Sequence, residues 1–373
     1  MNIGIDIRAA KWYRGTGLGT YTFQLIKTLN TLDKNNKYTL YNDHSTLDIN
    51  LSNNFYLIPV SSTKSNNFWE NVETPIALEN KDLQLYHIPQ NGIGLPLEET
   101  TPYVITLHDT IPLHMPETVS DKYLTLFNNS MEKIIKNCAG IITVSEYSKN
   151  DIAKDFNFPL DKIYVTYLAS EDIYTPINKS LCQRVLKKHY FNANNYILYV
   201  GGFSPRKNIS GLIKAFKKVK PFLPPDIKLV IAGTKGKSYS IYKQLTQDLD
   251  LEEHIIFPGF IEMEYMPYLY SGASVLVYPS FYEGFGLPPI EAMASGVPVI
   301  ASNVTSIPEI LGDSALLCNP FDIDALGEAL FSVLWDDSLR KDLILKGFKK
   351  SSSLTWENTA KETLKAYEGI INT

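Results

Sequence analysis

The stretch YPSFYEGFGLPPIEAMASGVPVIAS (residues 278–302) holds the pattern of one strand–helix–strand unit. The run ASVLVYPS (273–280) leads into this stretch and the run GVPVIAS (296–302) ends it, and both have the length and apolar content of buried strands. Between them, Pro288 and Pro289 suit the first turn of a helix, and Gly296 and Pro298 end it. A helix that joins two fully apolar strands is typical of a parallel sheet. The stretch therefore predicts an α/β fold.

Similar apolar runs, each followed by a turn and a helical pattern, recur along the 373 residues. The runs of the first half are IGIDI, YTLYN, FYLIPV, LQLYHIP, YVITLHD, GIITVS and KIYVTYL; those of the second are YILYVGG, KLVIAG, HIIFPG, ASVLVYPS, GVPVIAS and SALLCNP. The two series meet near residues 168–180, a polar stretch suited to a linker. We expect two doubly wound, Rossmann-like domains that face each other, with ligands in the cleft at the carboxyl ends of the strands.

Composition excludes several classes of function. Residues 1–175 carry a net charge of −6 and residues 176–373 one of +1, which argues against nucleic acid and against a broad basic membrane patch. No apolar run reaches the ~20 residues that cross a bilayer, and the sequence opens on a strand pattern rather than a signal peptide. Cys138, Cys182 and Cys318 are far apart and odd in number, which favours a reducing compartment. We expect a cytoplasmic protein.

A glycine-rich segment, RGTGLGT (14–20), follows the first strand and precedes a helical pattern. Such a segment suits a loop that approaches a phosphate. As a dinucleotide fingerprint it is incomplete, because Gly15-x-Gly17-x-x-Thr20 lacks the third small residue and lies late after the strand. Asp43, after the next strand, would serve as the ribose-binding acid of that fingerprint. A dinucleotide loop and a purely structural glycine turn both remain open.

Two carboxylates lie near the start of the helix predicted within residues 278–302. Glu283 lies in the glycine-rich turn before the helix, and Glu291 lies about one turn inside it. A helix N-terminus favours an anion, and the amides expected there belong to Gly284, Phe285, Gly286 and Leu287. Carboxylates beside such a place suit a polyhydroxylated ligand that carries phosphate. On spacing alone, a capping Glu and a solvated Glu remain the alternative.

Two adjacent cations follow the first strand of the second half, within YVGGFSPRKNISGLIKAF (199–216). Arg206 and Lys207 precede a helix whose N-cap is expected at Asn208 or Ser210. Paired cations at a strand end can neutralise a diphosphate, and Arg does so through a fork of donors. In isolation, an exposed basic turn would be the alternative.

A histidine ends a strand in YVITLHDTIPLHMPE (103–117). The strand looks buried, so His108 is expected to point into the cleft. Asp109 either fixes the tautomer of this histidine or caps the next turn. A lone histidine in a strand is commonly structural, and its position at the strand end is what favours a functional role.

No metal site is expected. His108 and His114, with a proline between them, make a weak metal pair. Two Asp-x-Asp matches, at 248–250 and 322–324, are interpreted as solvated helix ends, with Asp322 as an N-cap.

Taken together, these segments resemble the retaining GT-B glycosyltransferases of family GT4 (group 1), and they look nearest to bacterial polysaccharide mannosyltransferases. The segments that carry the resemblance are EGFGLPPIE with AMASGVPVIAS, VGGFSPRKN, and SIPEILGDSALLCNP (306–320). The late LTWENTAKETLKAYEGI looks like a terminal helix that crosses back to the first domain. The resemblance implies an acceptor domain at 1–173, completed by 357–373, and a nucleotide-sugar-binding domain at 174–356.

The resemblance also implies a role for the cations and the glycine loop. Lys207 matches the phosphate-binding Lys of the family, and Arg206 would assist it. Many members carry an Arg where this chain has Gly202. Gly17 would approach the donor diphosphate, so that RGTGLGT is not a dinucleotide fingerprint.

Further roles follow from the same resemblance. Glu291 would bind the ribose, Glu283 the hydroxyls of the transferred sugar, and the amides from Phe285 onward the sugar or its phosphate. His108 looks like the family's histidine near the anomeric centre, which orients a sugar hydroxyl and supports positive charge through its backbone carbonyl.

The implied activity is transfer of a hexose from a nucleoside-diphosphate sugar, with GDP-mannose tried first, to a glycan or lipid-linked acceptor, with retention. No metal or other cofactor is expected, and association with the inner face of the membrane would be peripheral at most. The alternatives are a sugar phosphorylase or epimerase of the same fold, an oxidoreductase with a complete glycine fingerprint, and a non-catalytic subunit that binds sugar nucleotides. The last would have lost catalytic positions, which are present here.

Overall fold

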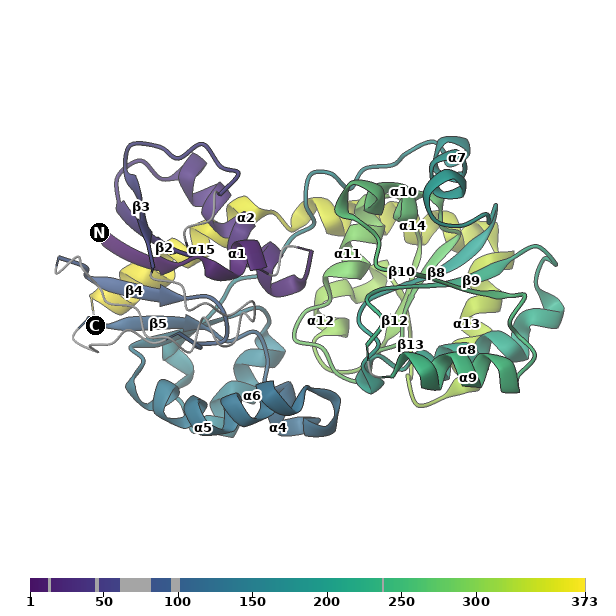
Figure 1. The fold of residues 1–373 in the computed structure, drawn as a ribbon, viewed down its shortest axis with the longest axis horizontal. Helices are drawn as coiled ribbons and strands as arrows, with labels where there is room; N and C mark the ends of the chain where they lie inside the picture. The colour runs from purple at the N-terminus through teal and green to yellow at the C-terminus, as the bar shows by residue number, and fades with distance from the viewer. Residues whose placement is uncertain (13–14, 44–46, 61–81, 95–100, 237, 373) are drawn as a thin grey trace. The chain divides into compact units, whose positions relative to one another are not determined.

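The computed structural model describes residues 1–373 except 13–14, 44–46, 61–81, 95–100, 237 and 373. The chain divides into two compact units, the first formed by Met1–Leu168 with Thr355–Thr373 and the second by Ala169–Leu354. The sequence suggested limits at 173/174 and 356/357. Each unit contains one parallel sheet covered by helices on both faces, as expected for two Rossmann-like domains (Figure 1).

The first sheet has the strand order β3-β2-β1-β4-β5-β6-β7, with every pair parallel. Its strands are β1 (Asn2–Asp6), β2 (Lys37–Asn42), β3 (Phe55–Pro59), β4 (Leu85–Ile88), β5 (Tyr103–Thr106), β6 (Gly140–Thr143) and β7 (Ile163–Val165). Each coincides with one of the apolar runs of the first half, with β1 and β2 beginning one residue before their runs, so the expectation is confirmed for all of them.

Helices cover both faces of this sheet (Figure 1). They are α1 (Arg8–Trp12), α2 (Gly17–Leu32), α4 (Ile111–His114), α5 (Asp121–Asn137), α6 (Glu146–Phe156) and α15 (Trp356–Ile371), with short 3₁₀ turns η1 (Pro116–Thr118) and η2 (Leu160–Lys162). Helix α15 packs on α2, β6 and β7, so the C-terminal helix lies with the first unit. The buried His87 fastens it there, with its Nδ1 2.7 Å from the Tyr367 hydroxyl and its Nε2 2.7 Å from the Thr106 hydroxyl.

The later part of the glycine-rich segment 14–20 lies in a helix and not in the loop that the sequence predicted for all of it. Helix α2 already begins at Gly17, and the Thr16 hydroxyl caps it by accepting from the Gly19 amide. The last two glycines therefore belong to the first turn of the helix.

The second sheet has the order β10-β9-β8-β11-β12-β13, again parallel throughout. Its strands are β8 (Tyr196–Val200), β9 (Lys228–Ala232), β10 (Ile255–Gly259), β11 (Val275–Tyr278), β12 (Val299–Ser302) and β13 (Leu316–Cys318), all within predicted runs. The chain adds β9 and β10 on one side of β8 and then β11, β12 and β13 on the other, so the order of the strands reverses between β8 and β11. In doubly wound folds ligands bind beyond the carboxyl ends of the strands at such a switch point.

Helices α8, α9 and α13 lie on one side of this sheet, and α10, α11 and α14 on the other (Figure 1). The helices and 3₁₀ turns are α7 (Lys179–His189), η3 (Pro205–Lys207), α8 (Ile209–Val219), η4 (Lys220–Phe222), α9 (Tyr239–Asp248), η5 (Met263–Tyr265), α10 (Met266–Gly272), α11 (Leu287–Ala294), α12 (Ile307–Leu311), η6 (Gly312–Ser314), α13 (Ile323–Trp335) and α14 (Asp337–Ser353). Asn208 caps α8 and Asp322 caps α13, as predicted. Apolar burial of α8, α9 and α13 against the sheet forms the core on their side.

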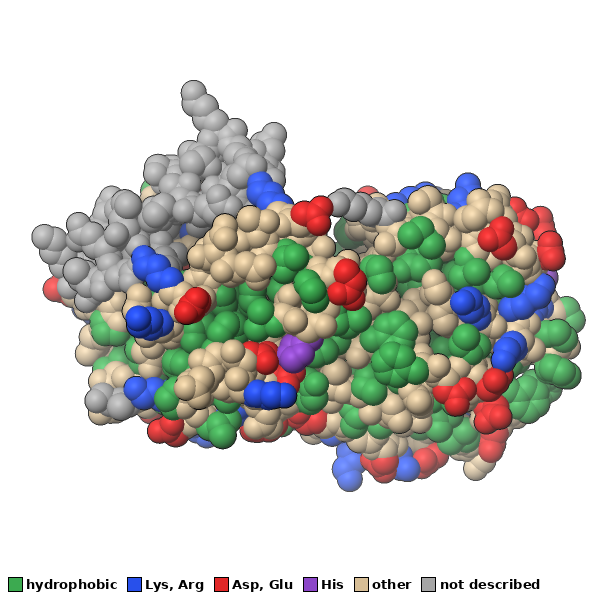
Figure 2. All heavy atoms as spheres, turned by 90° about the horizontal axis from the view of Figure 1, so that it is seen from below, with side chains coloured by type: hydrophobic (Ala, Val, Ile, Leu, Met, Phe, Trp, Pro, Cys, Tyr) green, Lys and Arg blue, Asp and Glu red, His purple; other side chains and the backbone are tan. Residues whose placement is uncertain are grey.

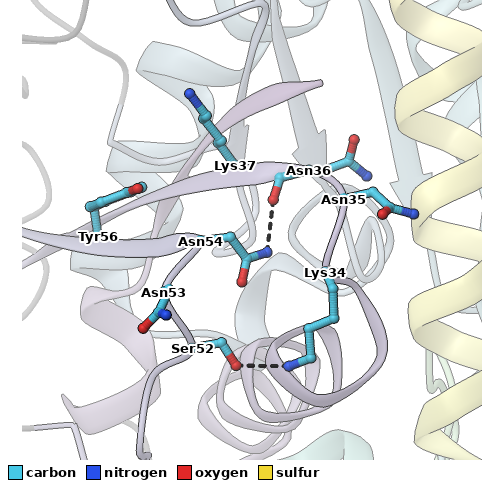
Figure 3. A pocket seen from close by; sticks show the side chains of 8 residues that line it. All are labelled: Lys34, Asn35, Asn36, Lys37, Ser52, Asn53, Asn54 and Tyr56. Carbon is cyan, nitrogen blue, oxygen red and sulfur yellow. Dashed lines mark hydrogen bonds between the residues drawn. The ribbon is translucent and has the colours of Figure 1, made fainter.

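A polar pocket lies at the amino-terminal ends of β2 and β3 in the first unit (Figure 3). It is lined by Lys34, Asn35, Asn36, Lys37, Ser52, Asn53, Asn54 and Tyr56. Its walls are joined by a hydrogen bond of 2.7 Å from Lys34 Nζ to Ser52 Oγ and one of 2.8 Å from Asn54 Nδ2 to the Asn36 carbonyl. These bonds hold the turn before β2 against the segment before β3. The predicted site residues of this unit follow the opposite, carboxyl ends of the strands.

Two glycines let the ends of β8 and β9 approach each other closely. Gly233, with φ of +153°, lies so near Gly201 that an added Cβ would stand 1.9 Å from the Gly201 carbonyl oxygen. No side chain fits there without displacing the backbone from which Arg206 and Lys207 follow.

We expect Gly233→Ala to lower the free energy of unfolding by at least about 2 kcal/mol, because the clash is with backbone that cannot rotate away. Gly236→Ala is the matched control, since a Cβ at Gly236 would meet no atom within 4 Å. Thermal unfolding of both full-length variants tests the expectation. Equal, small losses would mean that the strand ends lie further apart than described.

Candidate functional site

A cluster of two cations and one carboxylate lies at the carboxyl ends of β8 and β11, in the second unit. Lys207 Nζ is 2.5 Å from Glu283 Oε1 and donates to the Tyr278 hydroxyl over 2.9 Å. Arg206 Nη1 is 3.0 Å from Glu283 Oε2. Lys207 is the last residue of η3 and is buried, with 8% of its surface exposed. The alternative of an exposed basic turn is therefore wrong for Lys207.

The charge state of this cluster is set by its own members. Burial alone would raise the pKa of Glu283, but the charges of Arg206 and Lys207 outweigh burial and lower the pKa to about 2. Glu283 is thus ionised at any physiological pH. The three side chains form a buried ion-paired group with one excess positive charge, at the strand ends where a diphosphate was predicted.

The loop that carries Glu283 is anchored by the turn after β12. The Thr305 hydroxyl accepts from the Glu283 amide over 3.2 Å, and the Ser306 hydroxyl donates to the Glu283 carbonyl over 2.8 Å. Gly286, with φ of +101°, starts α11, and an added Cβ there would meet Ile307 at 2.8 Å. The predicted order of loop, Pro-Pro turn and short helix is confirmed.

The sequence predicted no role for Thr305 and Ser306, although Ser306 begins SIPEILGDSALLCNP, one of the segments that carry the family resemblance. Their signal is positional: small hydroxyl residues directly after an apolar strand, on the strand next to β11. Tyr278 was missed in the same way, because a strand-ending tyrosine looks like core until its hydroxyl is seen to reach Lys207.

Glu291 lies one turn inside α11, as predicted, in a different electrostatic environment. The Tyr270 hydroxyl donates to Glu291 Oε2 over 2.6 Å. Burial raises the pKa of Glu291 to about 7, and the hydrogen bond from Tyr270 opposes that rise. The two glutamates of the motif therefore differ: cations hold Glu283 ionised, whereas a phenol contacts a half-buried Glu291.

In the first unit, His108 follows β5 and is held at several points. Its amide donates to Asn91 Oδ1 over 3.0 Å, and its carbonyl accepts from the Ser148 hydroxyl over 3.1 Å. Its Nε2 lies 3.2 Å from the Pro89 carbonyl. Burial lowers the pKa of His108 to about 4, so the ring is neutral near pH 7.

The contact with Pro89 decides the tautomer of His108. A carbonyl only accepts, so the proton lies on Nε2 and the lone pair on Nδ1. Asp109 instead accepts from the Ile111 amide over 3.0 Å, which is the capping alternative. The imidazole thus offers an acceptor, as expected of a group that orients a sugar hydroxyl.

The carboxyl end of β1 carries a buried ion pair that the sequence did not reveal. Arg8 Nη2 is 2.6 Å from Asp6 Oδ2, and Gln90, which follows β4, donates to the same oxygen over 2.5 Å. Gly17, at the start of α2, is exposed. The structure thus brings Asp6, Arg8 and Gln90 together in the first unit, and Arg206, Lys207 and Glu283 in the second.

Residues weighed as metal ligands have other partners. His114 Nε2 is 2.8 Å from Asp155 Oδ2. Asp248 ends α9, and Asp322 accepts from the amides of the first turn of α13. Within the described part of the chain, no group of three or more His, Cys, Asp or Glu side chains could hold a metal ion.

Comparison with known proteins gives matches across both units. Residues 185–350 match the family described as Glycosyl transferases group 1, and residues 49–169 match Glycosyltransferase Family 4. The chain is 32% identical to an O-antigen chain mannosyltransferase B of Escherichia coli, over 95% of this chain and 97% of that protein. It is 37% identical to the O-antigen chain mannosyltransferase RfbU of Salmonella typhimurium, over 58% of this chain and 57% of that protein.

Solved structures share the two-unit fold. Sucrose-phosphate synthase of Thermosynechococcus elongatus matches with a TM-score of 0.79 and 22% identity, over 100% of this chain and 99% of that one. WaaG, a glycosyltransferase involved in lipopolysaccharide biosynthesis, matches with a TM-score of 0.71 and 15% identity, over 97% and 98%. Among the described residues, no helix has the length and apolar character needed to span a membrane.

The buried pair predicts that Lys207 matters for stability, in contrast to an exposed strand-end lysine. We expect Lys207→Met to lower the free energy of unfolding by about 1–3 kcal/mol, because it leaves Glu283 buried with one cation fewer. Adding Glu283→Gln should not recover that loss, since it also removes the carboxylate that pairs with Arg206. Chemical denaturation of the three proteins measures this. Lys218→Met is the control, because its ion pair with Asp324 is solvent-exposed.

The outcome that contradicts this is a double variant as stable as the wild-type protein. It would show that neither Lys207 nor Glu283 contributes to the stability of the second unit.

Proposed function

Because the chain belongs to the group 1 glycosyltransferases of family 4, we propose that it transfers a hexose from a nucleoside-diphosphate sugar with retention of configuration, and we take GDP-mannose as the first donor to test. Family membership makes the chain a glycosyltransferase with a nucleotide-sugar donor and a glycan acceptor. The names of its relatives support mannose as the sugar and a cell-surface polysaccharide as the product. The observation that carries the site assignment is the buried cluster of Arg206, Lys207 and Glu283.

The cations stabilise the leaving group. As the bond between sugar and diphosphate breaks, negative charge grows on the β-phosphate. Lys207 and Arg206 are already oriented by Glu283, so little reorganisation is needed when that charge appears. The N-terminus of α11, with Gly286 and Leu287 at its start, adds partial positive charge.

The two glutamates hold different parts of the donor. Each oxygen of an ionised carboxylate has two lone pairs, so Glu283 can accept from sugar hydroxyls while it keeps its cations. Glu291 binds the ribose hydroxyls. Since Glu283 also orients the phosphate-binding cations, its loss weakens diphosphate binding as well as sugar binding, which the sequence alone did not lead us to expect.

In the first unit, His108 contacts the transferred sugar. Its Nδ1 accepts from a hydroxyl, and its carbonyl, with one lone pair engaged by Ser148, offers the other to the positive charge of the oxocarbenium-like sugar. The acceptor hydroxyl attacks on the face from which the diphosphate leaves, which gives retention without a covalent intermediate.

The reaction takes place in the cytoplasm, with peripheral membrane association at most. Cys138, Cys182 and Cys318 are free and buried, which suits a reducing compartment. On the face drawn in Figure 2, basic side chains are interspersed with acidic ones among the described residues. The described residues of that face offer anionic lipid no broad basic area.

A screen of nucleotide sugars tests the donor. We expect GDP-mannose to raise Tm by several °C at saturating concentration, because ligand that binds only the folded state stabilises it by mass action. The Lys207→Met/Glu283→Gln double variant is the control. The donor should leave the Tm of this variant nearly unchanged. Transfer to a mannose-terminated glycan, followed by NMR of the new anomeric proton, then reports the configuration. Stabilisation by another nucleotide sugar alone would replace mannose as the substrate, and an inverted product would overturn retention.

Activity should be independent of divalent metal. The cations of Arg206 and Lys207 do the work that a metal ion does at other diphosphate sites. Initial rates in excess EDTA and in Mn²⁺ are therefore expected to agree within about twofold. A strict requirement for Mn²⁺ would mean that the diphosphate binds elsewhere.

A further inference from the structure

The segment that opens the second unit lies against the candidate ribose site. Its turn at residues 171–174 is closed by the Tyr174 amide, which donates to the Glu171 carbonyl over 3.1 Å. The Ser271 hydroxyl of α10 donates to the Thr175 carbonyl over 3.1 Å and accepts from the Ile177 amide over 3.2 Å. These bonds fix the opening segment to the helix that carries Tyr270.

Two tyrosines from these elements meet at the Glu291 carboxyl group. Tyr270 is fully buried and donates to Oε2 over 2.6 Å. Tyr174, with 7% of its surface exposed, also hydrogen-bonds to this carboxyl group, and its ring packs edge-on against that of Tyr270 at 5.3 Å between centroids. Two phenols therefore orient the Glu291 side chain in addition to its own helix.

A second carboxylate, that of Glu171, lies in the same segment and acts on Glu291 electrostatically. Glu171 is buried, with 5% of its surface exposed, and its negative charge makes ionisation of Glu291 less favourable. The titratable groups that act on Glu291 are thus Glu171 and Tyr174 from the opening segment and Tyr270 from α10, while Tyr278 of β11 acts in turn on Tyr270. The phenols favour the ionised form of Glu291, and burial and Glu171 oppose it.

We propose that Glu171, Tyr174 and Tyr270 are positioning residues for the donor, and that they make nucleoside binding at Glu291 release a proton. The proposal rests on the proposed function, in which Glu291 accepts hydrogen bonds from the ribose. The vicinal hydroxyls of a ribose donate two hydrogen bonds to an ionised carboxylate, whereas a protonated carboxyl group presents a donor to one of them. Below about pH 7 the empty site mostly holds the proton, and binding a nucleoside diphosphate expels it to solvent.

Affinity for a nucleoside diphosphate is therefore expected to rise with pH. With a titration near pH 7 in the empty protein, the affinity contributed by Glu291 falls about tenfold between pH 8 and pH 6. Glu171→Gln removes the opposing charge at constant shape but leaves the burial of Glu291 in place, so the midpoint of this dependence should move to lower pH. Tyr270→Phe removes a bond to the ionised form, so the midpoint should move to higher pH, and KM for the donor should rise more than kcat falls.

Isothermal titration of GDP into the full-length proteins from pH 5.5 to 8.5 provides the test; if GDP does not bind, the probe is the nucleoside diphosphate of the donor found in the screen. Protonation of the diphosphate itself is common to all variants and cancels in the ratio of variant to wild-type affinity. A ratio for Glu171→Gln that does not change with pH overturns the proposal. If that variant does not fold, an unchanged midpoint in Tyr270→Phe overturns it equally.

The variant Glu291→Gln distinguishes failure of the proposed proton release from failure of the ribose-binding role of Glu291. Unchanged GDP affinity in that variant at pH 8 would remove Glu291 from the ribose site, and the donor assignment would fail. Weakened affinity in Glu291→Gln, together with a pH dependence that Glu171→Gln leaves intact, would keep the ribose site and reject the proton release alone.

Discussion

The second unit depends on one buried electrostatic contact, between the Glu283 carboxylate and the side chains of Arg206 and Lys207. Buried charges are costly unless they are paired, so this group fixes three side chains from two strand ends in a single arrangement. The arrangement leaves one net positive charge beside the N-terminus of a helix. A site for an anion is thus formed before any ligand arrives, and the neighbouring backbone is shaped to keep it.

That shaping is visible in contacts that look structural when taken singly. Gly233 allows the ends of β8 and β9 to approach, Gly286 allows α11 to start close to Ile307, and Ser306 holds the Glu283 carbonyl. Each acts on the backbone from which a charged side chain departs. A displacement of a strand end would move a cation relative to its carboxylate, and the pairing energy falls steeply as a charge pair separates in a medium of low dielectric constant.

Much of the fold and of the site could be predicted from the sequence. The rest could not, for a physical reason. Apolar runs located the strands because a parallel sheet buried on both faces demands them. Residues such as Asn208 and Asp322 were predictable because a cap is local. Tyr278, Ser306 and Tyr270 were not, since their contacts join residues 71, 23 and 21 positions apart. The burial of Lys207 was missed for the same reason, because its partner Glu283 lies on another strand end.

Glu283 and Glu291 affect the pH dependence of stability in opposite directions. The pKa of Glu283 is lowered in the folded state, so this residue contributes stability above its unfolded pKa that is lost as the pH falls towards about 2. The pKa of Glu291 is raised to about 7, so its contribution has the opposite sign, and the fold loses free energy as the pH rises through the interval from its unfolded value to about 7. At neutral pH the empty protein therefore keeps a carboxyl group in a place where its charge is unfavourable. A residue selected for stability alone would be a glutamine or an apolar side chain there. A glutamate is favoured only if some ligand adds hydrogen-bond donors to those of the tyrosines, and hydroxyl groups of a sugar or a ribose are such donors.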